Sequence, residues 1–530
     1  MTMSRQTRRE LLRRAAALST VGAAASTFGF QLATMSTAAA QAAPPSYKAL
    51  VCIFLFGGND AHNMVLATDT DSWGRYNSAR QTGAVPIALM PVGTAPTPPG
   101  GTNAVTGRVL ANNVTAYQSP EAWGGVLPIS PLTPNPVPPG TNAPARTFGL
   151  NPHLAPLLPI WQGGRLAIAA NVGPLITPTT KTQYRNRSVP LPANLMSHND
   201  QQSTWQAGAA EGTRRGWGGL MADQILSGNG VNGVFTAMST AGNAVFLAGQ
   251  NVVQYQVTNS AAPAIRISSA LAPTTTVFGA AGAGARVQQI IRDTSGASHF
   301  MKDQAGKVIR AMDTADLLNN TFASPAIAGV PAPTALMNPI TRVNEVNGLA
   351  VQLQTVAKVI AANATFGIRR QVFFVSMGGF DNHDIQNTTQ SPLMARLAHA
   401  MAYFDTTLAT LGGADMRPAV TTFTASDFSR TFTTNGDGTD HAWGSHQFMM
   451  GGSVRGGDIY GQYPTLGVDQ GAFQNPDMSG NVLIPTMSVD QYAGTIGRWF
   501  GVGDAQLQSI FPNLNNFPTR YLNFLPGPMV

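Results

Sequence analysis

The sequence contains several nearly uninterrupted apolar runs of strand length. The first, KALVCIFLF (48–56), has no alternating polar position that would face solvent. Such a run is typical of a strand covered on both faces, as in a parallel sheet. Similar runs predict further strands in the last part of 152–173, after a short helix and a Gly-Gly turn, and at 244–249, 371–377, 419–426 and 445–452.

Between these runs, apolar residues recur at the spacing of a helical face. This spacing predicts helices over 285–311, 341–364, 392–411 and 488–502, and the third has a proline at its start and two glycines at its end. Because strands alternate with helices along the chain, we expect an α/β fold, with a mostly parallel sheet and helices on both of its faces.

One stretch, residues 81–148, is too rich in proline, glycine and threonine to sustain a helix or a central strand. The whole chain has 55 glycines and 37 prolines but only 11% charged residues, a composition that suits long loops. We therefore predict a single domain over 43–530 that carries a long surface insertion at about 81–148.

The first residues have the order of an export signal. TRRELLR (7–13) places two consecutive arginines before two leucines, an alanine-rich apolar stretch follows to about residue 33, and AAAQAA (38–43) offers small-residue cleavage sites. The pattern resembles a twin-arginine (Tat) signal, although a charged amphipathic helix is the alternative. We expect residues 1–42 to direct the chain through the Tat translocase, so that the mature protein is periplasmic or secreted.

Charge and cysteine content narrow the functional classes. Removal of residues 1–42 takes away five arginines and one glutamate and lowers the formal net charge from +7 to +3. Without a basic run, the mature chain gives no electrostatic case for nucleic-acid binding. No other stretch approaches the length of a membrane span. The single cysteine, Cys52, lies within the first predicted strand and leaves no intrachain disulfide.

Acidic residues and histidines cluster just beyond the predicted strands. Asp60, Asp381 and Asp427 each follow such a strand, and in an open α/β sheet the carboxyl ends of parallel strands form the ligand-binding edge. Three converging carboxylates would repel one another unless a cation held them. Oxygen and imidazole ligands suit zinc, manganese, magnesium or calcium. The clusters are GGNDAHN (57–63), MSHND (196–200), GGFDNHD (378–384), TASDFSR (424–430) and GTDHAWGSH (438–446).

Each of these residues also has a structural interpretation. An aspartate after a strand commonly caps a helix or a turn, and His153 has the position of a capping or packing residue before a short helix. The metal-site hypothesis therefore depends on the whole set of residues rather than on any one of them.

The order of these motifs resembles a known family. FLFGGNDAHNMV, FGLNPHLAPLL, SHNDQQSTWQ, VSMGGFDNHDIQ, TASDFSR and GTDHAWGSHQFMMGGSVRGG together look like the secreted DUF1501 family, over about 48–512 except the insertion. That family is grouped with the alkaline phosphatase and sulfatase superfamily. The resemblance implies a three-layer α/β/α sandwich with a site for one or two metal ions at the strand ends.

The resemblance assigns a metal role to individual residues. Asp60 resembles the first-strand metal aspartate, Asp381 with His383 resembles an Asp-and-His pair, and Asp427 and His441 match further ligands. Phe428 stands where a second-site histidine is expected, so that site lacks a ligand unless His198 or Asp440 replaces it. Zinc is the favoured ion, with manganese, calcium and magnesium as alternatives.

Two further residues are candidates for chemistry. Ser197 is the best candidate nucleophile, because a metal-bound hydroxyl is what attack on phosphorus or sulfur requires. Arg430 has the planar fork to bind an oxyanion, although a salt bridge is an equal alternative. No Cys-x-Pro-x-Arg signature is present, which excludes a formylglycine sulfatase.

The sequence thus leaves two hypotheses. The leading one is an exported metal-dependent hydrolase of phosphate or sulfate esters, with a small-molecule or polymeric substrate. The alternative is a catalytically degenerate superfamily member that acts as a binding or assembly protein of the cell envelope, and Phe428 favours it. Because fold does not determine function, the catalytic hypothesis rests partly on analogy.

Overall fold

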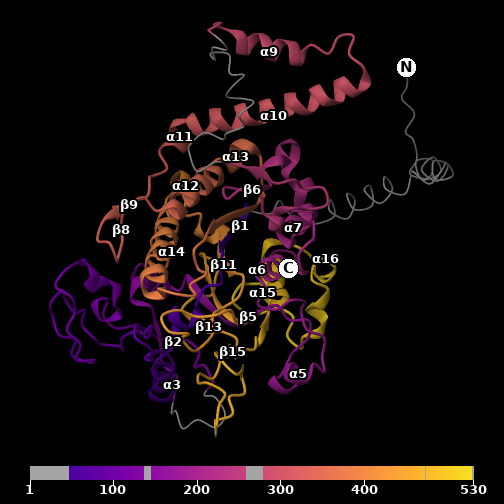
Figure 1. The fold of residues 1–530 in the computed structure, drawn as a ribbon. Helices are drawn as coiled ribbons and strands as arrows, with labels where there is room; N and C mark the ends of the chain where they lie inside the picture. Colours follow the sequence, from indigo (N-terminus) through magenta and orange to yellow (C-terminus); the bar gives the residue numbers. More distant parts are fainter. Residues whose placement is uncertain (1–46, 137–144, 258–278, 472, 528–530) are drawn as a thin grey trace. The chain divides into compact units, whose positions relative to one another are not determined.

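The central feature of the fold is one large sheet (Figure 1). A computed structural model describes residues 47–136, 145–257, 279–471 and 473–527. The predicted signal peptide, 1–42, lies outside the described residues. Within the described ranges the sheet has nine strands, of which β12 alone runs antiparallel to its neighbours. The predicted mixed α/β fold with a mostly parallel sheet is confirmed.

The order of the strands across the sheet differs from their order along the chain. From one edge to the other they are β13 (Asp458–Tyr460), β5 (Leu166–Gly173), β12 (Ser445–Met450), β11 (Val420–Ser426), β1 (Lys48–Leu55), β10 (Arg370–Met377), β6 (Ala237–Ser239) and β7 (Tyr255–Gln256), and β16 (Met487–Ser488) also pairs with β5.

Three central strands end in register. Leu55, the last residue of β1, pairs with Met377 at the end of β10 on one side and with Ser426 at the end of β11 on the other. Because all three strands are parallel, the segments that follow them leave the same edge of the sheet. This register brings together the loops that follow β1, β10 and β11, which contain Asp60, Asp381 and Asp427.

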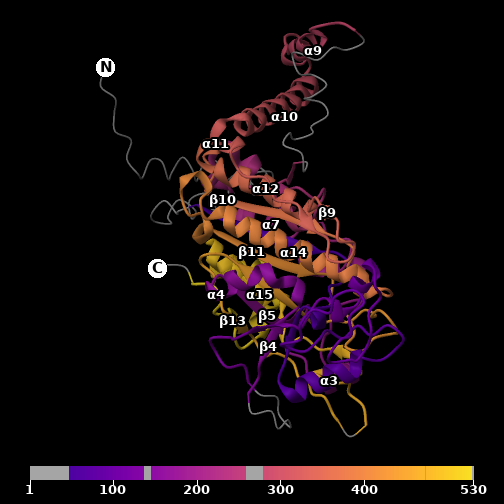
Figure 2. The same ribbon diagram turned by 90° about the vertical axis from the view of Figure 1, so that its left-hand side faces the viewer.

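Side chains of β1 enter two separate apolar clusters, as the unbroken apolar run predicts. Val51 and Ile53 pack with residues of α12 (Gly348–Ala361) and α14 (Gln386–Leu408). Leu50 and Cys52 pack with residues of α7 (Trp217–Ile225) and α15 (Val489–Phe500). Figure 2 shows α12 and α14 lying over the strands of the sheet. Both faces of the strand are therefore buried.

Two predicted elements differ in the structure. The apolar run 244–249 forms no strand. It forms a 3-10 turn, Val245–Leu247, in which the ring of Phe246 packs against the rings of Trp217 and Phe374. Periodicity alone does not distinguish such a short run from a strand. The helix predicted over 285–311 is two helices, α9 (Ala283–Arg292) and α10 (His299–Ala323). Asp293 breaks them apart, since its side chain accepts from both the backbone and the hydroxyl of Ser295.

The helix predicted over 392–411 begins six residues earlier, at Gln386, so that Pro392 lies inside it. The added polar turn has a structural role: the side chain of Gln386 donates to Asp60 Oδ2 at 2.6 Å. The predicted closing helix, 488–502, corresponds to α15.

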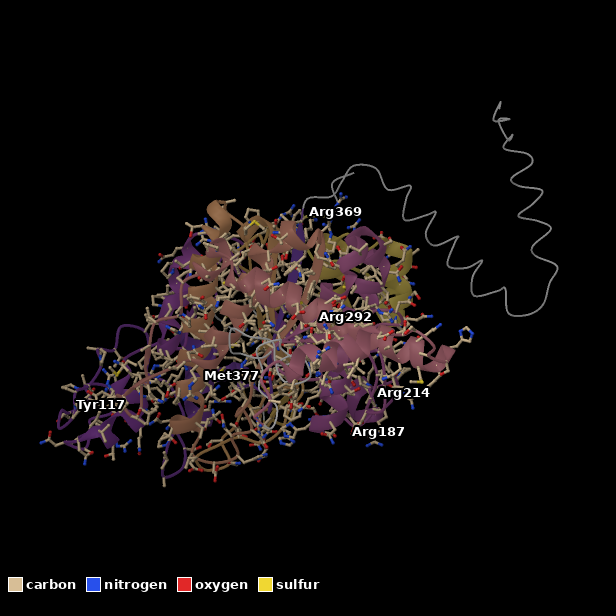
Figure 3. The ribbon with its side chains drawn as sticks, turned by 90° about the horizontal axis from the view of Figure 1, so that it is seen from above. Tyr117, Arg187, Arg214, Arg292, Arg369 and Met377 are labelled. Atoms are coloured by element: carbon tan, nitrogen blue, oxygen red, sulfur yellow. The ribbon has the colours of Figure 1, made fainter. Side chains whose placement is uncertain are left out.

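The 81–148 segment is only partly a surface insertion. Tyr117 lies at the outer edge of the molecule in Figure 3. However, the segment supplies β3 (Leu127–Ile129) to a small antiparallel sheet with β2 (Val65–Ala67) and β4 (Phe148–Leu150). It also buries apolar side chains such as Leu89 in the main core. No helix within the described ranges has the length and apolar character needed to cross a membrane.

Candidate metal centre

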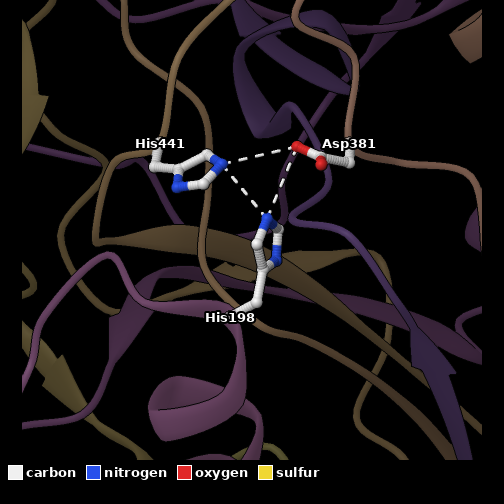
Figure 4. Close-up of side chains that lie close together, drawn as sticks. All are labelled: His198, Asp381 and His441. Carbon is white, nitrogen blue, oxygen red and sulfur yellow. Dashed lines mark hydrogen bonds and ion pairs between the residues drawn. The ribbon is translucent and has the colours of Figure 1, made fainter.

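The loops at the carboxyl edge of the central strands carry the candidate site (Figure 4). Asp381 lies four residues after β10, Asp427 immediately follows β11, and His441 lies in the loop between β11 and β12. His198 is the first residue of α6 (His198–Ala207). The site is therefore assembled from three separate parts of the chain: the start of α6, the loop after β10 and the connection between β11 and β12.

Two glycines after β1 make room for this assembly. Gly57 and Gly58 both have positive φ angles, 113° and 81°. A Cβ atom on Gly57 would lie 2.5 Å from the backbone nitrogen of Asp381, and one on Gly58 would overlap the ring of Phe428. The Gly-Gly pair is thus required by close packing of the site loops as well as by backbone conformation.

Three ligand-type atoms form a compact triangle. His198 Nε2 lies 3.1 Å from His441 Nε2, and Asp381 Oδ1 lies 3.5 Å and 3.4 Å from these two nitrogens. Ligands 2.0–2.1 Å from a tetrahedral ion are separated by about 3.3 Å. The spacing of the triangle therefore fits a single divalent ion.

The outer nitrogen of each imidazole fixes its tautomer. His198 Nδ1 lies 2.7 Å from Asp427 Oδ2, and His441 Nδ1 lies 2.9 Å from the carbonyl oxygen of Met196. Both partners are acceptors, so each Nδ1 carries the hydrogen. In its neutral form, each ring then presents an Nε2 lone pair to the other ring and to the Asp381 carboxylate. Three lone-pair donors at this distance repel one another unless a proton or a cation lies between them.

His383 adjoins the same triangle. Its Nε2 is 2.9 Å from His441 Nε2 and 3.1 Å from Asp381 Oδ1, and its Nδ1 is 3.2 Å from Asp440 Oδ1. It therefore shows the same arrangement as the other two histidines, with an acceptor behind the ring and Nε2 directed at the cluster. The side chain of His383 is 46% exposed, against 27% for His198 and His441.

Asp427 contacts His198 on the side of the imidazole that faces away from the triangle. Its side chain is fully buried, and Oδ2 accepts from the backbone of Gly57 at 3.2 Å and from Gln202 at 2.8 Å as well as from His198. The hydrogen bond to Asp427 raises the pKa of His198. A carboxylate behind a metal-ligating histidine orients the ring and increases its basicity. The structure thus places Asp427 behind a ligand rather than within the triangle.

Arg430 anchors Asp381. Partial burial opposes ionisation of Asp381, but the hydrogen bond and charge of Arg430 prevail and lower the pKa of this carboxyl. The guanidinium of Arg430 is buried and also donates to the carbonyl oxygens of Gly57, Gly58 and Thr439. Of the two alternatives that the sequence leaves open for Arg430, these contacts correspond to the salt bridge rather than to a fork that is open to an oxyanion. For His441 of the triangle, burial lowers the pKa of the imidazole, which favours its neutral form.

Phe428 fills the place where the resemblance expects a histidine. Its ring is completely buried, and its centroid lies 4.7 Å from the ring centroids of both His198 and His441. The phenyl group packs against the same two imidazoles that face Asp381. It therefore supplies apolar support where a second ion would need a ligand.

Asp60 is held elsewhere. Both of its oxygens bond to the guanidinium of Arg80, the last residue of α3 (Thr70–Arg80), and Gln386 donates to one of them. Asp60 and Arg80 are both buried. Asp60 thus has a fixed cation of its own and is not part of the Asp381 triangle.

Ser197 lies beside the cluster in sequence but has a different partner. It is the N-cap residue of α6, and its hydroxyl donates to Asp200 Oδ2 at 2.8 Å. This hydrogen bond lowers the pKa of Asp200. Among the described residues, the hydroxyl is bonded to its own helix rather than to a side chain of the triangle.

The structure therefore brings together Asp381, His383, Asp427 and His441 from the predicted set, and it adds His198. The sequence offered a signal for His198, since MSHND was one of the clusters, but a serine was the more obvious reactive group there. His62 and His446 are enclosed in the interior, and burial lowers the pKa of His446 to about 3. They are packing residues in this fold.

Comparison with known protein families identifies the family of the chain. No curated protein matches the sequence. The profile of a family described as protein of unknown function (DUF1501) matches residues 47–511, which include every residue of the candidate site. The chain therefore belongs to the DUF1501 family.

Proposed function

We propose that the protein is an exported metal-dependent hydrolase of phosphate or sulfate esters. The observation that carries the proposal is the triangle of His198 Nε2, His441 Nε2 and Asp381 Oδ1. The outer hydrogen bonds of the two imidazoles leave both Nε2 atoms directed at the cluster, and Asp381 Oδ1 adds a carboxylate oxygen that also accepts from Arg430. Zinc fits two imidazoles and a carboxylate best, and manganese is the second choice.

The proposal requires one ion. Phe428 packs against both histidines where a second ion would need a ligand. His383 adjoins the triangle from its exposed side, and there it serves as a fourth ligand or faces the substrate. Asp381 is 49% exposed, so the cluster is accessible to a substrate from solvent, including a group on a polymer.

The chain's own residues have defined tasks in this proposal. Asp427, Asp440 and the Met196 carbonyl hold the three imidazoles in one tautomer, and Arg430 holds Asp381 in its ionised form. A bound divalent ion supplies Lewis acidity, which makes a hydroxyl nucleophile available near neutral pH and offsets charge on the ester. Because Ser197 is bonded to Asp200, a water molecule is a better nucleophile than Ser197 in this arrangement.

Location and architecture complete the proposal. The order of residues 1–42 supports export through the Tat translocase to the periplasm or beyond. The burial of both faces of β1 under helices supports a three-layer, alkaline phosphatase-like sandwich. The substrate class comes from the superfamily resemblance, whereas the metal centre comes from the described contacts.

A binding or assembly protein of the cell envelope is the second candidate. The contacts that favour it are the internal engagement of Arg430 and the pairing of Asp60 with Arg80, which remove two groups that ester hydrolysis would otherwise use. In that case the ion would hold the strand-end loops together without performing chemistry.

Hydrolysis assays distinguish the two candidates. The mature protein, loaded with zinc or manganese, is tested on p-nitrophenyl phosphate, bis-p-nitrophenyl phosphate and p-nitrophenyl sulfate. A His441→Ala variant removes a triangle ligand, and His399→Ala is the matched control, because His399 lies on α14 and bonds to Thr334 and Asn347. We expect ester cleavage that His441→Ala abolishes and His399→Ala retains. A metal-loaded protein that cleaves no ester would leave the binding candidate.

A further inference from the structure

We propose that Gln201 is a positioning residue that sets the geometry of both imidazoles of the triangle. This inference rests on the proposed metal centre and names the residue on which its preorganisation depends. Gln201 lies one helical turn after His198 on α6 and is 1% exposed. Residues at this spacing share a helical face, so Gln201 is directed toward the same side as His198.

The side chain of Gln201 bonds to both supports of the triangle. Its Oε1 accepts from the backbone N–H of Met196, and its Nε2 donates to the backbone carbonyl of Asp427 at 3.3 Å. Met196 supplies the carbonyl that fixes His441, and Asp427 supplies the carboxylate that fixes His198. One amide thus connects the two groups that determine the two tautomers.

The backbone at Met196 makes this connection necessary. Met196 has a φ angle of 70°, in the left-handed region that a non-glycine residue rarely adopts. Such a conformation costs free energy and persists where the surroundings enforce it. The bond from Met196 N–H to Gln201 is a restraint of this kind, and it aims the adjoining carbonyl at His441. Without it, the segment before α6 is free to relax to an ordinary conformation.

The neighbouring glutamine has a narrower task. Gln202 Nε2 donates to Asp427 Oδ2 at 2.8 Å and therefore acts on the His198 side alone. Gln201, in contrast, bonds both to Met196 on the His441 side and to Asp427 on the His198 side. A purely structural role would be to pack α6 against the sheet, and Gln206 provides that comparison. Gln206 is buried on the same helix, and it accepts from the backbone of Phe246 at 3.2 Å, in the 3-10 turn Val245–Leu247.

The test compares Gln201→Met with Gln206→Met in the full-length mature protein. Each variant replaces a buried amide with an unbranched apolar chain of similar length. Zinc affinity is measured by competition with a chromophoric chelator, and cobalt-loaded protein gives the ligand-field spectrum. We expect Gln201→Met to weaken zinc affinity by roughly 10- to 100-fold, the range for lost partners behind metal ligands, and to alter the cobalt spectrum. Gln206→Met should change neither by more than about twofold, even where it lowers the melting temperature.

A second readout is independent of the metal. In metal-free protein, ¹⁵N NMR of the imidazoles reports which nitrogen of His441 carries hydrogen. The wild type should show the Nδ1–H form, and Gln201→Met should show a mixture. Gln201→Glu keeps an acceptor for Met196 N–H but loses the donor to Asp427, so its His441 tautomer should stay close to that of the wild type. If the wild type binds no metal, the proposed function fails while this readout still tests Gln201. Wild-type affinity and wild-type tautomer in Gln201→Met would overturn the inference.

Discussion

Two strand-end aspartates with similar local sequences have opposite environments. Asp60 follows β1 in GGND, and Asp381 follows β10 in GGFD, and the two strands are neighbours in register. Asp60 is buried in a two-point ion pair with Arg80. Asp381 is 49% exposed and faces three imidazole nitrogens within 3.5 Å.

The difference comes from what the rest of the chain delivers to each carboxylate. Helix α3 ends with Arg80 beside Asp60, so a fixed guanidinium balances that charge. The start of α6 and the loop before β12 bring histidines to Asp381, and Arg430 contacts one oxygen of this carboxylate. Both carboxylates contact a guanidinium, but Arg80 binds both oxygens of Asp60, whereas Arg430 binds only Oδ1 of Asp381, which also faces the imidazoles. The ion pair with Arg80 is therefore what separates Asp60 from a metal-ligand role.

The largest expected effect is on the Asp60 side. Arg80→Met removes the cation from a buried pair and leaves Asp60 uncompensated, which costs about 3–5 kcal/mol of unfolding free energy. The matched control is Arg75→Met on the same helix, since the Arg75–Asp71 pair is partly exposed and such pairs contribute about 0–1 kcal/mol. Urea unfolding of the metal-free protein measures both. Equal losses in the two variants would remove the distinction between Asp60 and an ordinary surface carboxylate.

The next effect is on metal affinity. Asp381→Asn should weaken zinc binding by more than about 100-fold, beyond the range for residues behind the ligands. Asp384→Asn, which removes the same charge from the same exposed loop, and Asp60→Asn should each stay within about threefold. Isothermal titration with a competing chelator measures all three. A loss in Asp60→Asn as large as in Asp381→Asn would restore Asp60 as a ligand.

A smaller loss is expected when the carboxylate behind His198 is neutralised. Asp427→Asn keeps an acceptor oxygen but removes the charge, and zinc affinity should fall by roughly 10- to 100-fold. The cobalt-loaded variant should keep the same number of ligands, as judged by the intensity of its visible absorption. Loss of a ligand from the cobalt site would mean that Asp427 binds the ion directly, as the superfamily resemblance implies.

The smallest effect concerns Ser197. Because its hydroxyl is engaged by Asp200, Ser197→Ala should leave the hydrolysis rate of the metal-loaded protein within about threefold of the wild type. Steady-state kinetics on the best ester from the panel measures it. A fall of roughly 1,000-fold or more with unchanged metal affinity would identify Ser197 as the nucleophile.

Local patterns in the sequence predict the strands of the site well. The unbroken apolar runs before Asp381 and Asp427 indicate buried parallel strands, and parallel strands bring their carboxyl ends to one edge. Partners that come from far along the chain are not local information. Nothing in GRYNSAR distinguishes Arg80 from a solvent-exposed arginine, and Phe428 is conspicuous only beside a family pattern. The MSHND cluster contains both His198 and Ser197, and what singles out His198 is its contact with Asp427, a residue 229 positions away in the sequence.

The central claim is that the cation site lies at Asp381 and not at Asp60. A crystal structure of the mature, zinc-loaded protein, with anomalous diffraction measured on both sides of the zinc absorption edge, tests it most directly. We predict one strong anomalous peak about 2.0–2.2 Å from His198 Nε2, His441 Nε2 and Asp381 Oδ1, and no peak beside the Asp60–Arg80 pair. A peak at Asp60, or the absence of any peak in protein crystallised with excess zinc, would contradict the account.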